Sequence, residues 1–495
     1  MQPVTLDDWQ RWQRQGYGLL PVAAQVAEAE LPLSLGAFGA GPVAAWLESA
    51  LAGRYTYICV EPARVIVGDT ARAEVRSGDF AQVLSTTGGA PLEVLSAYLA
   101  SRRAPPLPSD WPAMSGGLIG LFGYDLAHTW ENLPCVACRD LPLPLYAAIE
   151  PASLLVCDQV ERTLTAIVWS DLSAGQGSLA GRFAAAARRA DDLLARTAAP
   201  LQPEAAAGAV APAAGMAPPP SFSAEGFEAA ARRIHEYIAA GDTYQVNLSL
   251  RTSRATSAAP TEIYRALRRI NPSPYMGFFR LPSFALVCGS PELLVKLVDG
   301  RVSSRPIAGT RPRGAGEPQD TRYSAELLAS PKERAEHLML VDLIRNDIGR
   351  VAEYGSVTVD EFMVLERYSH VMHIVSQVEG RLASGRTWAD VFRAMFPGGT
   401  ITGCPKIRTM EIVEELEPVG RGYYTGALGW IGYNGAMELN IVIRSMLLQD
   451  GIAHVQAGAG VVADSQPERE LDESLRKAQA LWTALAAAEA AHRHV

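Results

Sequence analysis

The chain has 495 residues, of which 48% are apolar, and a formal net charge of −9 at pH 7. A chain of this length can bury a large core in one or two domains. The acidic balance argues against nucleic acid or an anionic membrane as a partner, so an anionic substrate would need a local cationic group or a metal ion.

The sequence carries no visible targeting or membrane signal. Its first residues lack the basic start and apolar run of a secretory signal, and no uninterrupted apolar stretch of about 18 residues predicts a membrane span. Six scattered cysteines are typical of a reducing cytoplasm. Cys135 and Cys138 form an isolated CxxC without further ligands nearby, so we expect no metal there. These features predict a cytoplasmic protein.

Composition divides the chain into two parts. Residues 196–221 are rich in alanine and proline and nearly free of charge, which predicts a flexible linker or long surface loop. The linker separates an N-terminal region, 1–195, from a C-terminal region, 222–495. In the N-terminal region we expect strands near 55–60 and 154–157 and glycine-rich turns near 115–124.

The C-terminal region has clearer periodicity. Phe227, Ala231, Ile234 and Ile238 recur at helical spacing, and Gly241 follows as a stop signal. Residues 244–250 alternate instead, which predicts a strand with Gln245, Asn247 and Ser249 on one face. Further strands are expected at 284–288, 427–433, 439–446 and 453–462, and helices at 322–346, 387–396, 405–416 and 466–490. This mixture predicts an α/β sandwich rather than a Rossmann repeat.

Two pairs of glutamates stand out. Glu333 and Glu336 share one face of a predicted helix, as do Glu470 and Glu473, and Lys477 lies one turn beyond Glu473. Such pairs are most often solvated surface charges. If the four carboxylates meet, they repel one another unless a cation lies among them, and oxygen ligands from two helices suit Mg²⁺.

A glycine- and threonine-rich loop precedes one predicted helix. Residues 398–406 read GGTITGCPK, with Pro405 near the first helical position. Free backbone donors, a helix N-terminus and Lys406 together predict an anion site. A tight turn with a surface lysine is the alternative.

Isolated residues in the last predicted strands add to this pattern. Arg444 interrupts an apolar run, so its charge needs a carboxylate from the protein or from a substrate. Gly458 and Gly460 mark a bulge or a close approach of backbone to a ligand. His373 alone is more typical of a buried, hydrogen-bonded histidine. Together with the glutamates, these residues predict a pocket for a small dianionic metabolite.

The C-terminal region resembles the chorismate-utilising enzymes. The resemblance rests on many segments in the family's order: GDTYQVNLS, NPSPYM, CGSPELLV, RPIAGTRPRG, KERAEHLMLVDLIRNDIGRV, SHVMHIVS, FPGGTITGCPKIRTMEIVEELEP, GYYTGALGW, NIVIRSM, AGAGVVADS and ERELDESLRK. It implies a mixed α+β or α/β sandwich like anthranilate synthase component I, with a two-sheet β core, helices outside and the site in a cleft.

The resemblance also implies roles for individual residues. Glu336 and Glu473 match Mg²⁺ ligands, with Glu470 and Glu333 in a water-mediated shell. The residues that match substrate contacts are Gly309, Thr400, Lys406, Tyr424, Arg444, Gly458, Gly460 and Lys477. The residues that match the catalytic set are Glu292, as general acid for loss of the C4 hydroxyl, His373, Gln245, Ala308 and Thr310.

Gln245 and Ala308 bear on the reaction. Relatives that use water carry a lysine base where this chain has Gln245, and glutamine cannot deprotonate water, so the resemblance implies ammonia as nucleophile. Ala308 excludes a lysine-linked intermediate at that position and, taken alone, favours the anthranilate synthases, which aminate C2 and eliminate pyruvate.

Other segments favour the aminodeoxychorismate synthases, which aminate C4. The short stretch 47–55, together with PIAGT and EELEP, resembles component I of that group. We therefore expect Mg²⁺-dependent conversion of chorismate to 4-amino-4-deoxychorismate, a step toward 4-aminobenzoate. Anthranilate synthase component I is the alternative, and a catalytically silent, amino-acid-binding regulatory subunit is an alternative from another class.

Two further expectations concern partners and regulation. No Cys-His-Glu glutaminase set is evident, so glutamine-dependent activity would need a separate glutaminase subunit. A possible tryptophan pocket is implied by the family, with simple packing between the two regions as the alternative; its residues would be Glu48, Ser49, Asn271, Pro272, Tyr275 and Met276.

Overall fold

The computed structural model describes residues 1–27, 41–50, 53–173, 177–197, 219–313, 316–367 and 371–492. Most of the predicted linker, 196–221, therefore lies outside the described residues. None of the helices in the described part is long and apolar enough to cross a membrane.

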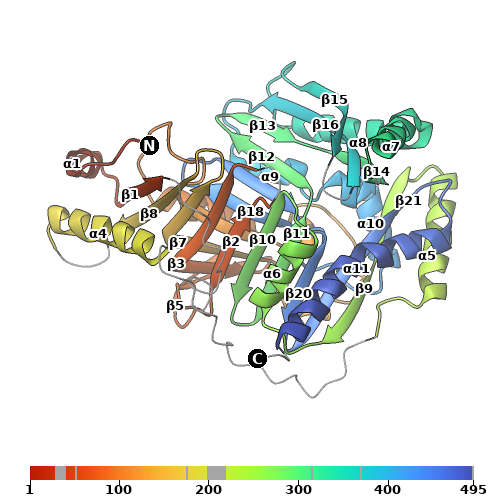
Figure 1. Cartoon of the computed structure of the whole chain (residues 1–495), viewed down its shortest axis with the longest axis horizontal. Coiled ribbons are helices and arrows are strands. Elements are labelled where there is room, and N and C mark those ends of the chain that lie inside the picture. The colour runs from red at the N-terminus through yellow and green to blue at the C-terminus, as the bar shows by residue number, and fades with distance from the viewer. Residues whose placement is uncertain are drawn as a thin grey trace.

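The strands of the described residues belong to one hydrogen-bonded network in which named pairs run antiparallel (Figure 1). They are β1 (Leu19–Ala27), β2 (Ala44–Glu48), β3 (Tyr55–Gly68), β4 (Arg72–Ser77), β5 (Val83–Gly88), β6 (Gly117–Phe122), β7 (Tyr146–Asp158), β8 (Thr163–Asp171), β9 (Gln245–Ala255), β10 (Tyr275–Leu281), β11 (Phe284–Ser290), β12 (Leu293–Val298), β13 (Arg301–Ser304), β14 (Ile307–Pro312), β15 (Thr358–Arg367), β16 (Val371–Arg381), β17 (Gly403–Cys404), β18 (Ala427–Gly432), β19 (Met437–Ile441), β20 (Ser445–Gln449) and β21 (Ile452–Val461).

Helices pack around these strands. They are α1 (Leu6–Arg14), α3 (Pro91–Ser101), α4 (Leu179–Thr197), α5 (Ala224–Ala239), α6 (Pro260–Ile270), α7 (Glu317–Ala329), α8 (Pro331–Gly349), α9 (Trp388–Met395), α10 (Lys406–Leu416) and α11 (Pro467–His492), with the short 3-10 helices η1 (Tyr124–Thr129) and η2 (Gly399–Ile401). The predicted mixed α/β fold is confirmed. We expected the strands to form two sheets, but hydrogen bonds join them into one network.

The N-terminal and C-terminal regions share strand pairing and core. β2 pairs with β10, and β6 pairs with β18, so in Figure 1 the red and orange strands continue into the green and blue ones. Trp46 on β2 stacks on Phe278 of β10, with ring centroids 4.2 Å apart and planes at 11°. Stacking of two buried aromatic rings adds to the free energy gained from burying their area.

The strand over 244–250 forms as predicted and positions part of the site. Val246, Leu248 and Leu250 pack into a core with α5, α10 and β21. The alternate residues Gln245 and Asn247 turn to the opposite face, because successive side chains on a strand point to opposite sides. The predicted turns near 115–124 are wrong in part, since Gly117–Phe122 is the buried strand β6.

The helix predicted over 322–346 is two helices. Ser330 has an extended backbone, with φ −69° and ψ 113°, and Pro331 begins α8. A proline disfavours helical geometry at the residue before it, which explains the break. The Ser330 hydroxyl accepts a hydrogen bond from the backbone N–H of Glu333 at 3.4 Å, so the break places Glu333 in the first turn of α8.

The strand predicted over 439–446 is also interrupted. β19 ends at Ile441 and β20 begins at Ser445, and Arg444 between them has a φ of 51°. A non-glycine residue in this left-handed region is uncommon and often marks a functional site. The kink replaces regular pairing at Arg444, whose carbonyl accepts a hydrogen bond from Gly289 at 3.0 Å.

Candidate active site

A cavity of about 580 Å³ lies between α8, α11 and the ends of several strands. Its volume is in the range of small-molecule sites. It brings together most of the residues predicted from sequence: Gln245, Glu292, Ala308, Gly309, Glu333, Glu336, His373, Thr400, Tyr424, Arg444, Gly458, Gly460, Glu470, Glu473 and Lys477. The backbone of Thr310 lies in β14, but its side chain is outside the described part of the structure.

The two glutamate pairs face each other across this cavity from α8 and α11. Burial raises the pKa of Glu336, and the nearby carboxylates of Glu333 and Glu473 raise it further. Burial and the charge of Glu473 also raise the pKa of Glu470. Raised values mean that the carboxylates are deprotonated only at a cost in free energy, which a bound cation would offset.

Protein cations contact only some of these carboxylates. Arg311 pairs with Glu333 at 3.2 Å, and Lys477 pairs with Glu473 at 2.8 Å. Glu336 instead accepts a hydrogen bond from the amide of Gln245, at 3.4 Å. Among the described residues, no three of the glutamates place their oxygens within 4.8 Å of one another. A Mg²⁺ ion here would bind one or two of these carboxylates directly and others only through its waters, because Mg²⁺ keeps several waters when protein carboxylates bind it.

Arg444 supplies positive charge to the lining of the cavity. No carboxylate of the described residues lies within 4.0 Å of its guanidinium, whose Nη1 donates to the Lys477 carbonyl at 3.5 Å. Burial lowers its pKa. Buried Tyr424 lines the cavity beside it. A guanidinium that faces a cavity with no carboxylate of the described residues within 4.0 Å is suited to a substrate carboxylate.

Lys477, Gly458 and Gly460 form another polar part of the cavity wall. Nζ of Lys477 donates to the carbonyl of Gly458 at 3.0 Å as well as to Glu473. A Cβ atom at Gly460 would lie 2.3 Å from Nε2 of Gln245. Glycine there lets the Gln245 side chain approach the β21 backbone. The predicted approach of this backbone to a ligand stays a prediction.

Glu292 is buried in the cavity wall, at the turn that joins β11 to β12. Burial raises its pKa to about 7, and the Thr400 hydroxyl and the charge of Lys477 offset part of that effect. A carboxyl group with this pKa keeps a proton through much of the neutral range, which is the state required of a general acid.

His373 is held as a neutral ring. Its Nδ1 lies 3.1 Å from the carbonyl of Gly309, so Nδ1 carries the proton and donates it. Burial lowers the pKa of the ring. Gly309 has a φ of 66° at a bulge between Ala308 and Thr310 in the pairing of β14 with β16. A Cβ at Gly309 would lie 2.9 Å from Oε2 of Glu333.

Lys406 does not lie where the sequence predicted. Its Nζ donates to Asp347 at 2.6 Å and to the carbonyl of Met395 at 3.3 Å, and it is absent from the described lining of the cavity. The expectation of a substrate contact is corrected, because α10 directs this side chain toward α8. Pro405 is likewise the residue before α10 rather than its first residue.

Sequence reasoning missed several cationic residues of the cavity. Arg311, Lys332 and Arg476 line it, and each is a sequence neighbour or near neighbour of a predicted site residue. Arg311 lies two residues beyond Gly309, Lys332 precedes Glu333, and Arg476 precedes Lys477. This closeness in sequence could have identified the three residues. Helix periodicity did not, because it places neighbouring residues on different faces of a helix.

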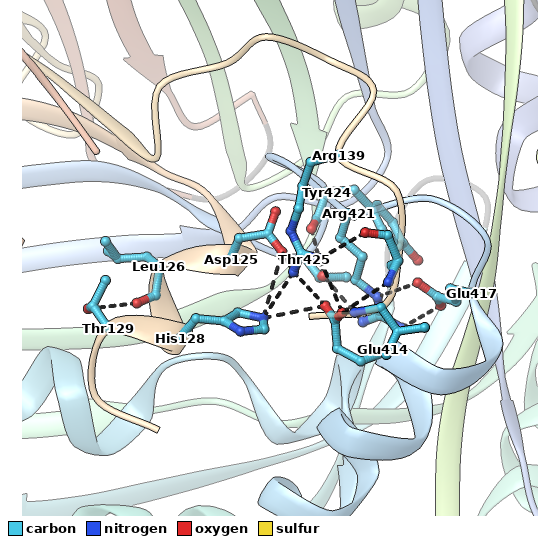
Figure 2. A network of polar contacts seen from close by, with 12 residues as sticks. Asp125, Leu126, His128, Thr129, Arg139, Glu414, Glu417, Arg421, Tyr424 and Thr425 are labelled. Atoms are coloured by element: carbon cyan, nitrogen blue, oxygen red, sulfur yellow. Dashed lines mark hydrogen bonds and ion pairs between the residues drawn. The ribbon is translucent and has the colours of Figure 1, made fainter. Parts of the chain in front are cut away.

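A second polar cluster lies outside the cavity, at the junction of η1 and α10 (Figure 2). Ligand atoms of Asp125, His128 and Glu414 lie within 4.8 Å of one another. The guanidinium of Arg139 already occupies the centre, with Nη2 2.8 Å from Glu414 and 3.2 Å from Asp125. These ion pairs hold the pKa of Glu414 low, at about 2, against the effect of burial. The cluster is therefore an ion-pair network.

The predicted tryptophan pocket is present only as a small cavity of about 50 Å³. Glu48, Ser49, Tyr275 and Met276 line it. Asn271 and Pro272 are not part of its described lining and lie in the turn between α6 and β10.

Comparison with known proteins identifies the class of protein to which this fold and cavity belong. The sequence profile described as chorismate binding enzyme matches residues 44–483. The chain belongs to this family. The matched range includes strands of both the N-terminal and the C-terminal region.

Individual relatives fall into two groups. The chain is 43% identical to aminodeoxychorismate synthase component 1 of Bacillus subtilis, over 90% of this chain and 92% of the relative. It is 40% identical to anthranilate synthase component 1 of Pseudomonas aeruginosa, over 98% and 99%. Among solved structures, anthranilate synthase component I of Streptococcus pneumoniae superposes with a TM-score of 0.75 and 32% identity, covering 87% of this chain and 92% of the other.

Proposed function

We propose that this enzyme aminates chorismate at C4 and forms 4-amino-4-deoxychorismate, with Mg²⁺ as cofactor and ammonia from a separate glutaminase subunit. The placement of Gln245 carries the proposal for ammonia. Its neutral amide lies beside Glu336 in the cavity. An amide cannot take a proton from water at neutral pH, whereas ammonia attacks without a base.

Several side chains of the cavity would have roles in this reaction. Arg444 and Lys477 would bind substrate carboxylates, and Glu336 and Glu473 would hold Mg²⁺, with Glu333 and Glu470 around its waters. When bound, the ion would supply positive charge to a substrate carboxylate. Replacement of the C4 hydroxyl by ammonia releases water, so the leaving oxygen needs a proton, which Glu292 would donate.

Amination at C2 is the second candidate, because Ala308 lines the cavity where a lysine nucleophile would stand and because relatives named anthranilate synthase component 1 match nearly the whole chain. The C4 assignment is supported by the relative of Bacillus subtilis and by the short segment that leads from β2 to β3. Both groups of relatives are named component 1, which supports a partner subunit.

Product analysis separates the two reactions. The protein is incubated with chorismate, MgCl₂ and ammonium chloride, with and without a lyase that converts 4-amino-4-deoxychorismate to 4-aminobenzoate. We expect 4-aminobenzoate only when the lyase is added. Anthranilate fluorescence without the lyase would overturn the C4 assignment, and no consumption of chorismate under either condition would favour a regulatory subunit.

A further inference from the structure

Arg421 lies outside the cavity but contacts three segments that form its walls. It follows α10, is only 4% exposed and pairs with the equally buried Glu417. Its Nε donates to Oε2 of Glu417 at 2.9 Å, and Nη2 donates to Oε1 at 2.8 Å. This two-point contact neutralises the buried charge and fixes the plane of the guanidinium.

The remaining N–H groups of Arg421 reach the walls directly. Nη2 donates to the carbonyl of Asn247 on β9 at 2.6 Å, and Nη1 donates to the carbonyl of Ile401 at 2.9 Å. Both Asn247 and Ile401 line the cavity. Nη1 also lies 3.3 Å from the hydroxyl of Thr425, which follows Tyr424. One side chain thus fixes β9, the η2 turn and the segment 424–425 relative to one another.

The third segment needs such support. Thr425 has a φ of 60°, which is strained for a β-branched residue. The Arg421 contact and a bond from its N–H to the carbonyl of Val442, at 2.8 Å, hold it in place. The guanidinium carbon also lies 5.8 Å from the ring centroid of Tyr424 and 4.8 Å from that of Tyr124, so Tyr424 keeps its place in the cavity wall.

Glu417 extends the same network to the next strand. Its Oε1 accepts hydrogen bonds from the backbone N–H and the hydroxyl of Ser249, both at 2.8 Å. The Ser249 hydroxyl in turn accepts from Gln456, which lines the cavity from β21. In Figure 2, Arg421 and Glu417 lie together, close to Tyr424 and Thr425.

We propose that Arg421, held by Glu417, is a positioning residue that sets the spacing of the cavity walls and thereby the affinity for chorismate. The proposal rests on chorismate binding, which the family defines, and not on which carbon is aminated. A failed C4 assignment therefore leaves it standing.

The variant Arg421→Lys tests the proposal. Lysine keeps a positive charge beside Glu417, but one ammonium cannot reach the five acceptors that the planar guanidinium serves. The measurements are the Kd for chorismate by calorimetry with MgCl₂, KM and kcat for chorismate consumption with ammonium, and Tm by circular dichroism. We expect Kd and KM to rise about tenfold or more, because displaced walls no longer fit the substrate.

Arg139→Lys is the matched control. Arg139 forms a neighbouring ion pair, with Glu414 of α10, and contacts Asp125 and His128 instead of the cavity walls (Figure 2). We expect Kd to stay within about twofold of the parent value, with a smaller fall in Tm than in Arg421→Lys, because the Arg139 side chain is 30% exposed and that of Arg421 only 1%. An unchanged Kd in Arg421→Lys, or an equal rise in both variants, would overturn the proposal.

A second variant covers the case in which Arg421→Lys does not fold. Glu417→Gln keeps the shape of the side chain and one oxygen acceptor, but it removes the charge that fixes the guanidinium. We expect Kd to rise about threefold or more in the folded protein. A parent-like Kd in this variant would also refute the positioning role.

Discussion

The side-chain amide of Gln245 donates to Oε1 of Glu336 across the cavity, at 3.4 Å. The bond joins the residue that argues for ammonia to a predicted Mg²⁺ ligand. It is long and comes from a neutral group, so it compensates little of the charge on Glu336. The pKa of Glu336 is accordingly raised by burial and by Glu333 and Glu473, which leaves this carboxylate available to a cation.

Glu336→Gln should therefore weaken the response to Mg²⁺. The amide has nearly the same size but cannot supply the negative charge that the ion needs. We expect the MgCl₂ concentration for half-maximal chorismate consumption to rise about tenfold or more. Asp342→Asn is the control, since Asp342 is an exposed residue of the same helix. Equal Mg²⁺ dependence in both variants would contradict the assignment of Glu336.

Glu292→Gln should lose most of the turnover. Glutamine cannot donate a proton to the leaving hydroxyl, and loss of a general acid typically costs about 10²- to 10⁴-fold in rate. The pKa of Glu292, about 7, also sets a pH dependence: the protonated form predominates below pH 7, so the rate that depends on Glu292 falls as the pH rises through 7. Profiles of kcat and kcat/KM from about pH 5.5 to 9 check both points, because kcat/KM reports the pKa of the free enzyme; a variant with near-parent kcat would refute the role.

The same substitution should stabilise the fold at alkaline pH. Burial raises the pKa of Glu292 from 4.5 to about 7, so the unfolded chain loses this proton at lower pH than the folded chain. The free energy of unfolding therefore falls between pH 4.5 and 7 by on the order of 3 kcal/mol because of this group. Glutamine does not titrate. Urea unfolding should show Glu292→Gln to be more stable than the parent at pH 8 but not at pH 4. If the difference in stability between the two proteins does not change with pH, the raised pKa of Glu292 is contradicted.

Local periodicity predicted the parts of the site that depend on neighbouring residues. The spacing of Glu333 and Glu336, and of Glu470 and Glu473, gave the correct helix faces, and alternation placed Gln245 on the cavity side of β9. The breaks at Ser330 and Arg444 were missed, although a charged residue at 444 interrupts the apolar run there. The proline after Ser330 was a usable signal.

Long-range ion pairs could not be predicted in the same way. Lys406 pairs with Asp347, which lies 59 residues earlier in the chain, and Arg139 pairs with Glu414, 275 residues away. Each pair depends on how helices and loops pack, which sequence spacing does not encode. Arg421 escaped notice for a further reason: its main acceptors include backbone carbonyls, which no motif of side chains reveals.

Arg444→Met should weaken chorismate binding with little loss of stability. No carboxylate of the described residues lies within 4.0 Å of Arg444, and burial lowers its pKa, so removing the charge leaves no protein acid unpaired. Loss of a desolvated partner for a substrate carboxylate should raise Kd about 100-fold. Arg444→Lys should recover part of this loss. Calorimetry gives Kd and thermal unfolding gives Tm for both variants. A large fall in Tm with an unchanged Kd would contradict the prediction.

Tryptophan should not inhibit this enzyme. The cavity beside Glu48 and Ser49 is only about 50 Å³, which holds a few waters but not an indole. The Glu48 carboxylate is already bonded to Nε of Arg268 at 2.6 Å and to the Tyr264 hydroxyl at 3.0 Å. Chorismate consumption at millimolar tryptophan should match the rate without it. A fall in the rate as tryptophan is added would contradict this prediction.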